Sequence, residues 1–523
     1  MVRDSFCSYY TNSKDITSYM AAKLGIDHND LILEPSAGEG IFIDEILSMN
    51  KAVRVDALDA NSEAIAVLKK KYKNNDFVVV RETDTLLDEQ LDSYSISQLW
   101  LKQTDTLLDY QLDVFGAAGG HYSKVIGNPP YGAWQDFKKR DVLKKKFAGH
   151  YVKETYALFL LRCISVLKMH GKLTFIVPDT FLFLNMHARL REVLFSNTKI
   201  DEILIFSSKF FPGVSFGYSN LSIITLARCE RNEALENKFK VIRGFKSSNE
   251  FKAILGNDNK YPDHLQIYSL VQKDVLANEQ SRMILAEPKT SVIIKKTPHK
   301  LGDIANIVTG FYTGDNQKFI KVLSKSVKGA KNYEVIKTDQ IFRCTSLYGI
   351  PDVQEGYVPY IKSTSKRRYL RQNDEWFVRW DRDTIDFYNK NKKSRFQNSS
   401  FYFKTGIGIP MVKSNTIRAF LMQDHVFDQS IVGIFPKQKD TLYYLLAFMN
   451  SDLVNTLIHT INPTANNSAN YIKQIPYIEP AEDVKGLVTA KVKKIILLES
   501  DMKYAAADEL HGQINVHIED LYS

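Results

Sequence analysis

The chain has 523 residues, of which 44% are hydrophobic and 25% charged, a composition typical of a globular protein with two or three domains. No apolar run approaches the roughly 20 residues that a membrane-spanning helix needs, and the first residues lack the apolar core of a secretion signal, so we expect a cytoplasmic protein without a membrane partner. The four cysteines are too scattered for a disulfide framework or a zinc site, and the formal charge of +9 suits a polyanionic partner.

The first half of the chain alternates between apolar strands and amphipathic helices. We expect helices at 15–24, 62–72, 155–167 and 188–195, together with one that ends near Met49. Strands are expected from Asp30 to Glu34 and at 53–59, 76–84, 173–178, 200–206 and 221–227. This order predicts an α/β fold with a mainly parallel sheet and helices on both faces.

The first strand runs into a Gly-x-Gly turn that opens a helix. Glu34 ends the strand, and Gly38 and Gly40 allow the backbone to approach a ligand closely. A nicotinamide-dependent enzyme would have a third glycine where this chain has Ile43. The carboxylate of Glu34 therefore favours a pocket for S-adenosylmethionine.

Two more carboxylates follow the next strands. Asp59 can accept both ribose hydroxyls of the cofactor, with a solvated, helix-capping aspartate as the alternative, and Asp84 can accept the adenine amine. Residues 83–92 recur almost unchanged as residues 104–113. Only the first copy follows a strand, so we favour Asp84 and keep Asp105 as the alternative.

The sequence Asn128-Pro129-Pro130-Tyr131 follows a further apolar run. The Asn128 side chain and the Pro129 main chain each offer a carbonyl, so two acceptors can converge on one amino group. Two acceptors favour the pyramidal, more nucleophilic form of an exocyclic amine. Tyr131 offers a flat face to a planar ring, and Phe211 could cover the other face, with core packing as its alternative. The motif suggests methyl transfer to such an amine.

Basic residues gather in two places. We predict a mobile, phosphate-binding loop, with a solvated helix face as the equal alternative, for Lys138, Lys139, Arg140, Lys144, Lys145 and Lys146. After about residue 240 the strand–helix alternation ends, and residues 309–319 form a glycine-permitted turn. Cations that alternate with aromatic residues then predict phosphate and base contacts, or else a charged face over an aromatic core: Lys362, Lys366, Arg367, Arg368, Arg371, Arg379 and Arg382, with Tyr369, Trp376, Phe377 and Trp380.

With these residues in place, residues 9–230 resemble the γ-class N6-adenine DNA methyltransferases of bacterial type II restriction-modification systems. The cofactor-binding positions of that family correspond to Thr11, Glu34, Ala37, Gly38, Gly40, Asp59 and Asp84. Its catalytic positions correspond to Asn128, Pro129, Pro130, Tyr131 and Phe211. One departure is Asn12, where the family commonly has proline.

The resemblance implies three segments. Residues 1–240 would form a Rossmann-like S-adenosylmethionine-dependent methyltransferase domain, and residues 241–481 a mixed α+β target recognition domain. Residues 482–523, which are helical by their period, would pack on the second domain. The implied activity is site-specific transfer to the N6 of an adenine flipped out of double-stranded DNA, without a metal ion. A cognate restriction endonuclease would be the partner in such a system.

Three alternatives remain open from the sequence. The same fold could act on guanine in ribosomal RNA or on protein glutamine, although enzymes of those classes usually lack a large basic carboxyl-terminal domain. The chain could also be an inactive DNA-specificity subunit, which the intact Glu34, Asp59 and Asn128 argue against. A nuclease pattern formed by residues 262–263 and 287–289 is best explained by chance, because proline interrupts its expected strand.

Overall fold

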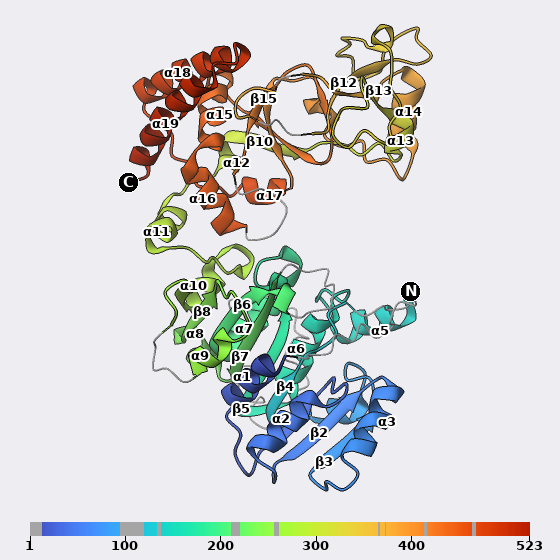
Figure 1. The fold of residues 1–523 in the computed structure, drawn as a ribbon, viewed down its shortest axis with the longest axis vertical. Coiled ribbons are helices and arrows are strands. Elements are labelled where there is room, and N and C mark those ends of the chain that lie inside the picture. The colour runs from blue at the N-terminus through green and yellow to red at the C-terminus, as the bar shows by residue number, and fades with distance from the viewer. Residues whose placement is uncertain are drawn as a thin grey trace. The chain divides into compact units, whose positions relative to one another are not determined.

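The protein is described by a computed structural model that covers residues 13–94, 120–132, 137–210, 220–255, 261–363, 367–371, 373–412, 416–462 and 467–523. Tertiary contacts divide the chain into two compact units, Met1–Met283 and Ile284–Ser523 (Figure 1). This division falls later than the boundary expected near residue 240. The reason is that two further strands extend the sheet of the first unit beyond that point.

The first unit is built on a nine-stranded sheet of order β3-β2-β1-β4-β5-β7-β6-β8-β9. Its strands are β1 (Leu31–Glu34), β2 (Arg54–Asp59), β3 (Val78–Glu82), β4 (Tyr122–Gly127), β5 (Leu167–Pro178), β6 (Thr198–Ser207), β7 (Asn220–Arg228), β8 (Lys238–Arg243) and β9 (Gln266–Val271). Strands β3, β2, β1, β4 and β5 are parallel neighbours, whereas β7 runs antiparallel to both β5 and β6. The predicted α/β fold with a mainly parallel sheet is confirmed.

Helices connect these strands. They are α1 (Lys14–Leu24), α2 (Ile41–Met49), α3 (Ser62–Lys71), α4 (Glu89–Tyr94), α5 (Phe137–Lys146), α6 (Thr155–Val166), α7 (Ala188–Asn197), α8 (Arg231–Glu236), α9 (Glu250–Leu255) and α10 (Gln272–Ala277). The helices expected at 15–24, 62–72, 155–167 and 188–195 are all present, with ends shifted by one or two residues. Helix α6 is buried along its whole length, as its apolar sequence requires.

Helix α5 corrects the loop prediction for the basic segment. Its residues contain no glycine or proline, and lysine and arginine are good helix formers. Leu143 and the following Phe147 are completely buried, so the helix is anchored on one side although most of its side chains are charged.

The second unit combines two four-stranded sheets with helices, and its mixed α+β class is as predicted. The first sheet has the order β10-β17-β14-β15 and the second β11-β13-β12-β16. The strands are β10 (Ala305–Thr309), β11 (Ile320–Val322), β12 (Tyr357–Ile361), β13 (Trp376–Arg379), β14 (Gly406–Pro410), β15 (Phe420–Met422), β16 (Val426–Phe427) and β17 (Ile431–Pro436). The helices are α11 (Pro288–Lys296), α12 (Leu301–Ile304), α13 (Asn316–Phe319), α14 (Arg382–Lys390), α15 (Leu442–Asn450), α16 (Asp452–Ile461), α17 (Ala469–Ile472), α18 (Glu482–Ser500) and α19 (Tyr504–Leu521).

The C-terminal helices share a core with the first of these sheets. Val488 and Val492 of α18 and Ile514 of α19 lie in one buried cluster with Ile407 of β14 and Ile434 of β17. Each of these five side chains is fully buried. Among the described residues, no helix has the length and apolar character needed to cross a bilayer.

The interpretation of the aromatic residues near 370 as base contacts is wrong. Tyr369, Trp376, Phe377 and Trp380 are all at most 2% exposed. Trp376 and Phe377 are consecutive on β13 and point to opposite sides of it, so both faces of this strand are covered. Arg367, two residues before Tyr369, is bound by carboxylates of α18 and α19. The structure therefore supports the alternative of a charged face over an aromatic core.

Candidate active site

The carboxyl ends of β1, β2 and β4 lie side by side, because β1 pairs in parallel with both neighbours. Glu34, the last residue of β1, is only 1% exposed. Burial raises the pKa of Glu34 well above its ordinary value, and the nearby Asp59 and Asp44 add to this effect. Within the described part of the chain, its Oε2 atom is buried without a hydrogen-bond partner. Such an atom suits a ligand that brings its own donor.

Replacing Glu34 with glutamine tests the raised pKa of Glu34 through the pH dependence of protein stability. A carboxyl group whose folded-state pKa is raised stabilises the fold fully below its ordinary pKa, and this stabilisation is lost as pH rises through the raised value. Between the ordinary and the raised pKa, we therefore expect the free energy of unfolding of ligand-free Glu34→Gln to rise relative to that of the wild type by about 1.4 kcal/mol per pH unit. Thermal unfolding from pH 4 to pH 8 measures this, and parallel curves for the two proteins would contradict it.

Asp59 organises the glycine turn. Its Oδ2 accepts a hydrogen bond from the Gly38 N–H at 2.8 Å, and its Oδ1 accepts one from the Asn61 N–H at 2.8 Å. Each oxygen keeps a second lone pair, so a ribose hydroxyl can still donate to it. Ala37 closes the turn, since its N–H donates to the Leu58 carbonyl and its own carbonyl accepts from the Gly40 N–H, both at 2.8 Å.

Only glycine fits at position 40. Its φ is 80°, in the left-handed region, and an added Cβ would lie 2.7 Å from the Tyr72 hydroxyl and 2.8 Å from Leu68 Cδ2. Gly38, with a φ of 51°, is also left-handed. Gly40 is therefore needed where the turn packs closely on the side chains of Leu68 and Tyr72.

Asp84 follows β3 and is joined to the glycine turn through the next residue. The Thr85 hydroxyl donates to the Pro35 carbonyl at 2.5 Å. The Asp84 Oδ1 accepts from the Leu86 N–H at 3.1 Å, and its Oδ2 pairs with Lys139 of α5 at 2.5 Å. The Thr85 side chain thus ties the loop that carries Asp84 to Pro35, the residue after Glu34.

The 128–131 motif also contacts the glycine turn. The Ser36 hydroxyl donates to the Asn128 main-chain carbonyl at 3.2 Å, so the motif and the turn touch. The Pro130 carbonyl accepts from the Thr155 hydroxyl at 2.5 Å, which holds the chain after Pro129. The ring of Tyr131 is 1% exposed and makes an edge contact with Tyr156 at 6.4 Å between centroids. Base stacking on Tyr131 stays a prediction.

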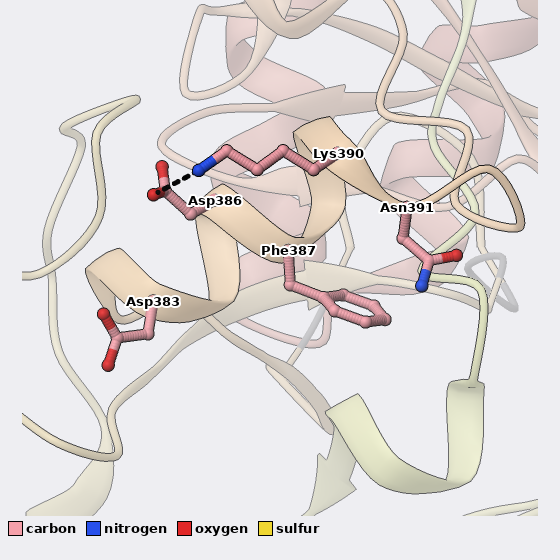
Figure 2. Close-up of a pocket in the computed structure, with 5 residues that line it drawn as sticks. All are labelled: Asp383, Asp386, Phe387, Lys390 and Asn391. Carbon is pink, nitrogen blue, oxygen red and sulfur yellow. Dashed lines mark hydrogen bonds and ion pairs between the residues drawn. The ribbon is translucent and has the colours of Figure 1, made fainter.

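Two predicted site residues, Thr11 and Phe211, lie outside the described residues, as does the alternative acid Asp105. Within the described residues, no group of three or more His, Cys, Asp or Glu side chains is placed to hold a metal ion. A surface pocket in the second unit is formed along α14 by Asp383, Asp386, Phe387, Lys390 and Asn391, and Figure 2 shows the ion pair between Lys390 and Asp386 there. None of the predicted site residues belongs to this pocket.

The sequence interpretation missed Arg162 and Asp179. Arg162 of α6 is completely buried and donates to the carbonyls of Thr85 at 3.3 Å and Asp88 at 2.6 Å, so it supports the loop that carries Asp84. In the sequence, Arg162 could have been recognised as a single arginine within an otherwise apolar helix. Asp179 follows β5, the parallel neighbour of β4, and burial raises its pKa to about 6. Its position directly after a strand could have identified it.

The first unit matches a known protein family. Residues 33–211 match the family described as Eco57I restriction-modification methylase. This range contains Glu34, Asp59 and Asp84, and it also includes the 128–131 motif.

Individual relatives extend the likeness to most of the chain. The chain is 26% identical over 493 residues to the type II methyltransferase M.HindII of Haemophilus influenzae. This alignment covers 84% of the chain and 82% of M.HindII. It is 22% identical to the adenine-specific methyltransferase BrxX of Escherichia coli, over 68% of this chain and 28% of BrxX. The solved structure of the type IIL restriction-modification enzyme MmeI in complex with DNA has a TM-score of 0.57 and 10% identity, covering 97% of this chain and 71% of that chain. The likeness to MmeI confirms the fold class.

Proposed function

We propose that this chain, an adenine-specific DNA methyltransferase of the restriction-modification type, moves the methyl group of S-adenosylmethionine to the N6 nitrogen of an adenine in double-stranded DNA. Its family match and its relatives M.HindII and BrxX support this activity. The observation that carries the proposal is the contact between Ser36 and the Asn128 carbonyl, which joins the cofactor turn to the acceptor motif.

The residues at the strand ends fit the cofactor. The Oε2 atom of Glu34, which is buried without a hydrogen-bond partner among the described residues, would accept from the cationic amine of its methionine part. Asp59 would accept from the ribose hydroxyls, and Asp84 from the adenine amine. When bound, the cofactor supplies an electrophilic methyl group on a sulfonium.

The acceptor side of the reaction falls to Asn128 and Pro129. Their carbonyls would accept the two N–H bonds of the target amine, which favours its pyramidal form and directs its lone pair toward the cofactor side. Because the motif touches the cofactor turn, alignment of the two reactants supplies much of the rate. Tyr131 and Phe211 would hold the flipped base, which requires the Tyr131 ring to become accessible first.

The second unit would select the DNA sequence. It contributes a folded body with two sheets and its own cores, distinct from the catalytic unit. We propose that it binds the duplex as a target recognition domain, in the cytoplasm, and that a cognate restriction endonuclease cleaves the same site when it is unmethylated.

Cofactor affinity tests the assignment of Glu34. A charge-assisted hydrogen bond contributes about 1.5–3 kcal/mol, so Glu34→Gln should weaken S-adenosylmethionine binding roughly 10- to 100-fold. Isothermal titration calorimetry measures the affinity, with Glu63→Gln on the neighbouring helix α3 as the control. Unchanged binding in Glu34→Gln would remove this residue from the cofactor site.

The identity of the product tests the activity itself. The purified chain is incubated with plasmid DNA and methyl-labelled S-adenosylmethionine, and the digested nucleosides are separated by mass spectrometry. We expect the label in N6-methyldeoxyadenosine. Label that appears only when ribosomal RNA or a protein acceptor replaces the DNA would assign the chain to another acceptor class.

A further inference from the structure

Helix α5 links the catalytic motif to the cofactor-binding acid. It begins six residues after Tyr131, and its Lys139 makes the ion pair with Asp84 at 2.5 Å. The local backbone already uses the other oxygen of this carboxylate through the Leu86 N–H. Lys139 therefore binds the Asp84 oxygen that the backbone leaves open, and the adenine amine of the cofactor would be a second donor to it.

The exposed side of α5 is suited to nucleic acid. The helix carries six cationic residues and a single acidic one. Lys138 and Lys145 are exposed, and Phe137 at the first position is 83% exposed with the Arg140 guanidinium 5.8 Å from its ring centroid. Cations beside an accessible aromatic ring are the pattern of proteins that track a nucleic-acid strand.

The other end of α5 is fixed to the catalytic unit. Lys146 pairs with Asp92 of α4 at 2.8 Å, and Leu143 is fully buried. The Lys139–Asp84 pair is 33% and 27% exposed, and the Lys146–Asp92 pair is 21% and 44% exposed, so the buried Leu143 rather than an ion pair anchors the helix. A partly exposed ion pair contributes little to stability, so Lys139 can change its partner without loosening α5.

We propose that α5 is a contact surface for the DNA backbone beside the target base, and that Lys139 joins this contact once the adenine of the cofactor takes Asp84 from it. This inference rests on the proposed function, because it needs both the cofactor and the DNA. An adenine amine that donates to the second lone pair of this oxygen takes up part of its negative charge, which weakens the ion pair with Lys139. The displaced ammonium then pairs with a phosphate, so cofactor binding and DNA binding favour each other.

DNA affinity at several salt concentrations tests the exchange. The full chain is titrated into a fluorescent 30-base-pair duplex with and without S-adenosylhomocysteine, which carries the adenine but has no methyl group to transfer. For the wild type we expect tighter DNA binding with S-adenosylhomocysteine and a slope of log K against log salt that steepens by about 0.9, the value for one added phosphate contact. In Lys139→Gln, S-adenosylhomocysteine should bind several-fold more tightly but leave the salt slope unchanged.

Lys145→Gln is the matched control on the same helix. It should reduce the salt slope both with and without S-adenosylhomocysteine and keep the difference between the two conditions. A Lys139→Gln protein that still responds to S-adenosylhomocysteine like the wild type would overturn the proposal, as would a wild type without any response. In either case, continued formation of N6-methyladenine by the wild type would leave the proposed function standing.

Discussion

Replacing Asn128 with alanine is expected to lower the rate of methyl transfer about 10²–10³-fold, the usual effect of removing one preorganised polar group from a reacting centre. The alanine removes the side-chain carbonyl that would accept an N–H bond of the target amine. The main-chain contact with Ser36 does not depend on the side chain, so the cofactor turn keeps its shape. Single-turnover transfer on plasmid DNA gives the rate, and calorimetry with S-adenosylhomocysteine gives the cofactor affinity.

Asn249→Ala serves as the control for this variant. Asn249 is an exposed residue immediately before α9. Its replacement should change neither the rate nor the affinity. If Asn128→Ala turned over at the wild-type rate, the role of the motif in holding the amine would be refuted.

A second large effect is expected from Gly310→Ala in the turn after β10. An added Cβ would lie 2.1 Å from the Phe427 carbonyl oxygen and 2.4 Å from that of Asp428. Both obstructing atoms belong to the backbone, and the Phe427 carbonyl already accepts a hydrogen bond from the Phe311 N–H. Moving this carbonyl away from the added Cβ would therefore break the hydrogen bond. We expect the second unit to lose about 3 kcal/mol of stability. Chemical denaturation followed by circular dichroism measures this loss.

Gly486→Ala is the control for this second variant. The site lies inside α18, and nothing would lie within 4 Å of the added Cβ. Alanine there should stabilise the helix by up to about 1 kcal/mol.

We also expect Gly310→Ala to lower DNA affinity while binding of S-adenosylhomocysteine to the first unit persists. Equal denaturation midpoints for the two variants would show that position 310 tolerates a side chain.

The catalytic half could be predicted from sequence because each signal there is local. A buried strand followed by Gly38 and Gly40 specifies a turn that needs left-handed backbone, and the structure has both glycines in that conformation. The same logic placed Asp59 at the end of β2, where it holds the turn. Parallel pairing then brings these separate strand ends to one edge.

Other features depend on distant contacts and could not be predicted. The sequence of α5 has almost no apolar face, so its anchoring through Leu143 is visible only in three dimensions. Trp376 and Trp380 sit between arginines and lysines in sequence, a pattern that fits a DNA-binding surface and a buried strand equally well. These tryptophans are buried because β13 pairs with β11 on one side and β12 on the other. The expected boundary near residue 240 falls inside β8, which pairs with β6 on one side and β9 on the other, so the sheet of the first unit continues beyond it.

The proposed activity is tested most directly by single-molecule sequencing of plasmid DNA from cells that express the wild type or Asn128→Ala, with N6-methyladenine scored at every position. We expect methylation of adenine within one short sequence motif in the wild type, and a much smaller methylated fraction at the same sites in the variant, whose transfer rate is about 10²–10³-fold lower. Unmethylated adenine throughout the wild-type plasmid, from protein that is folded and binds S-adenosylmethionine, would contradict it.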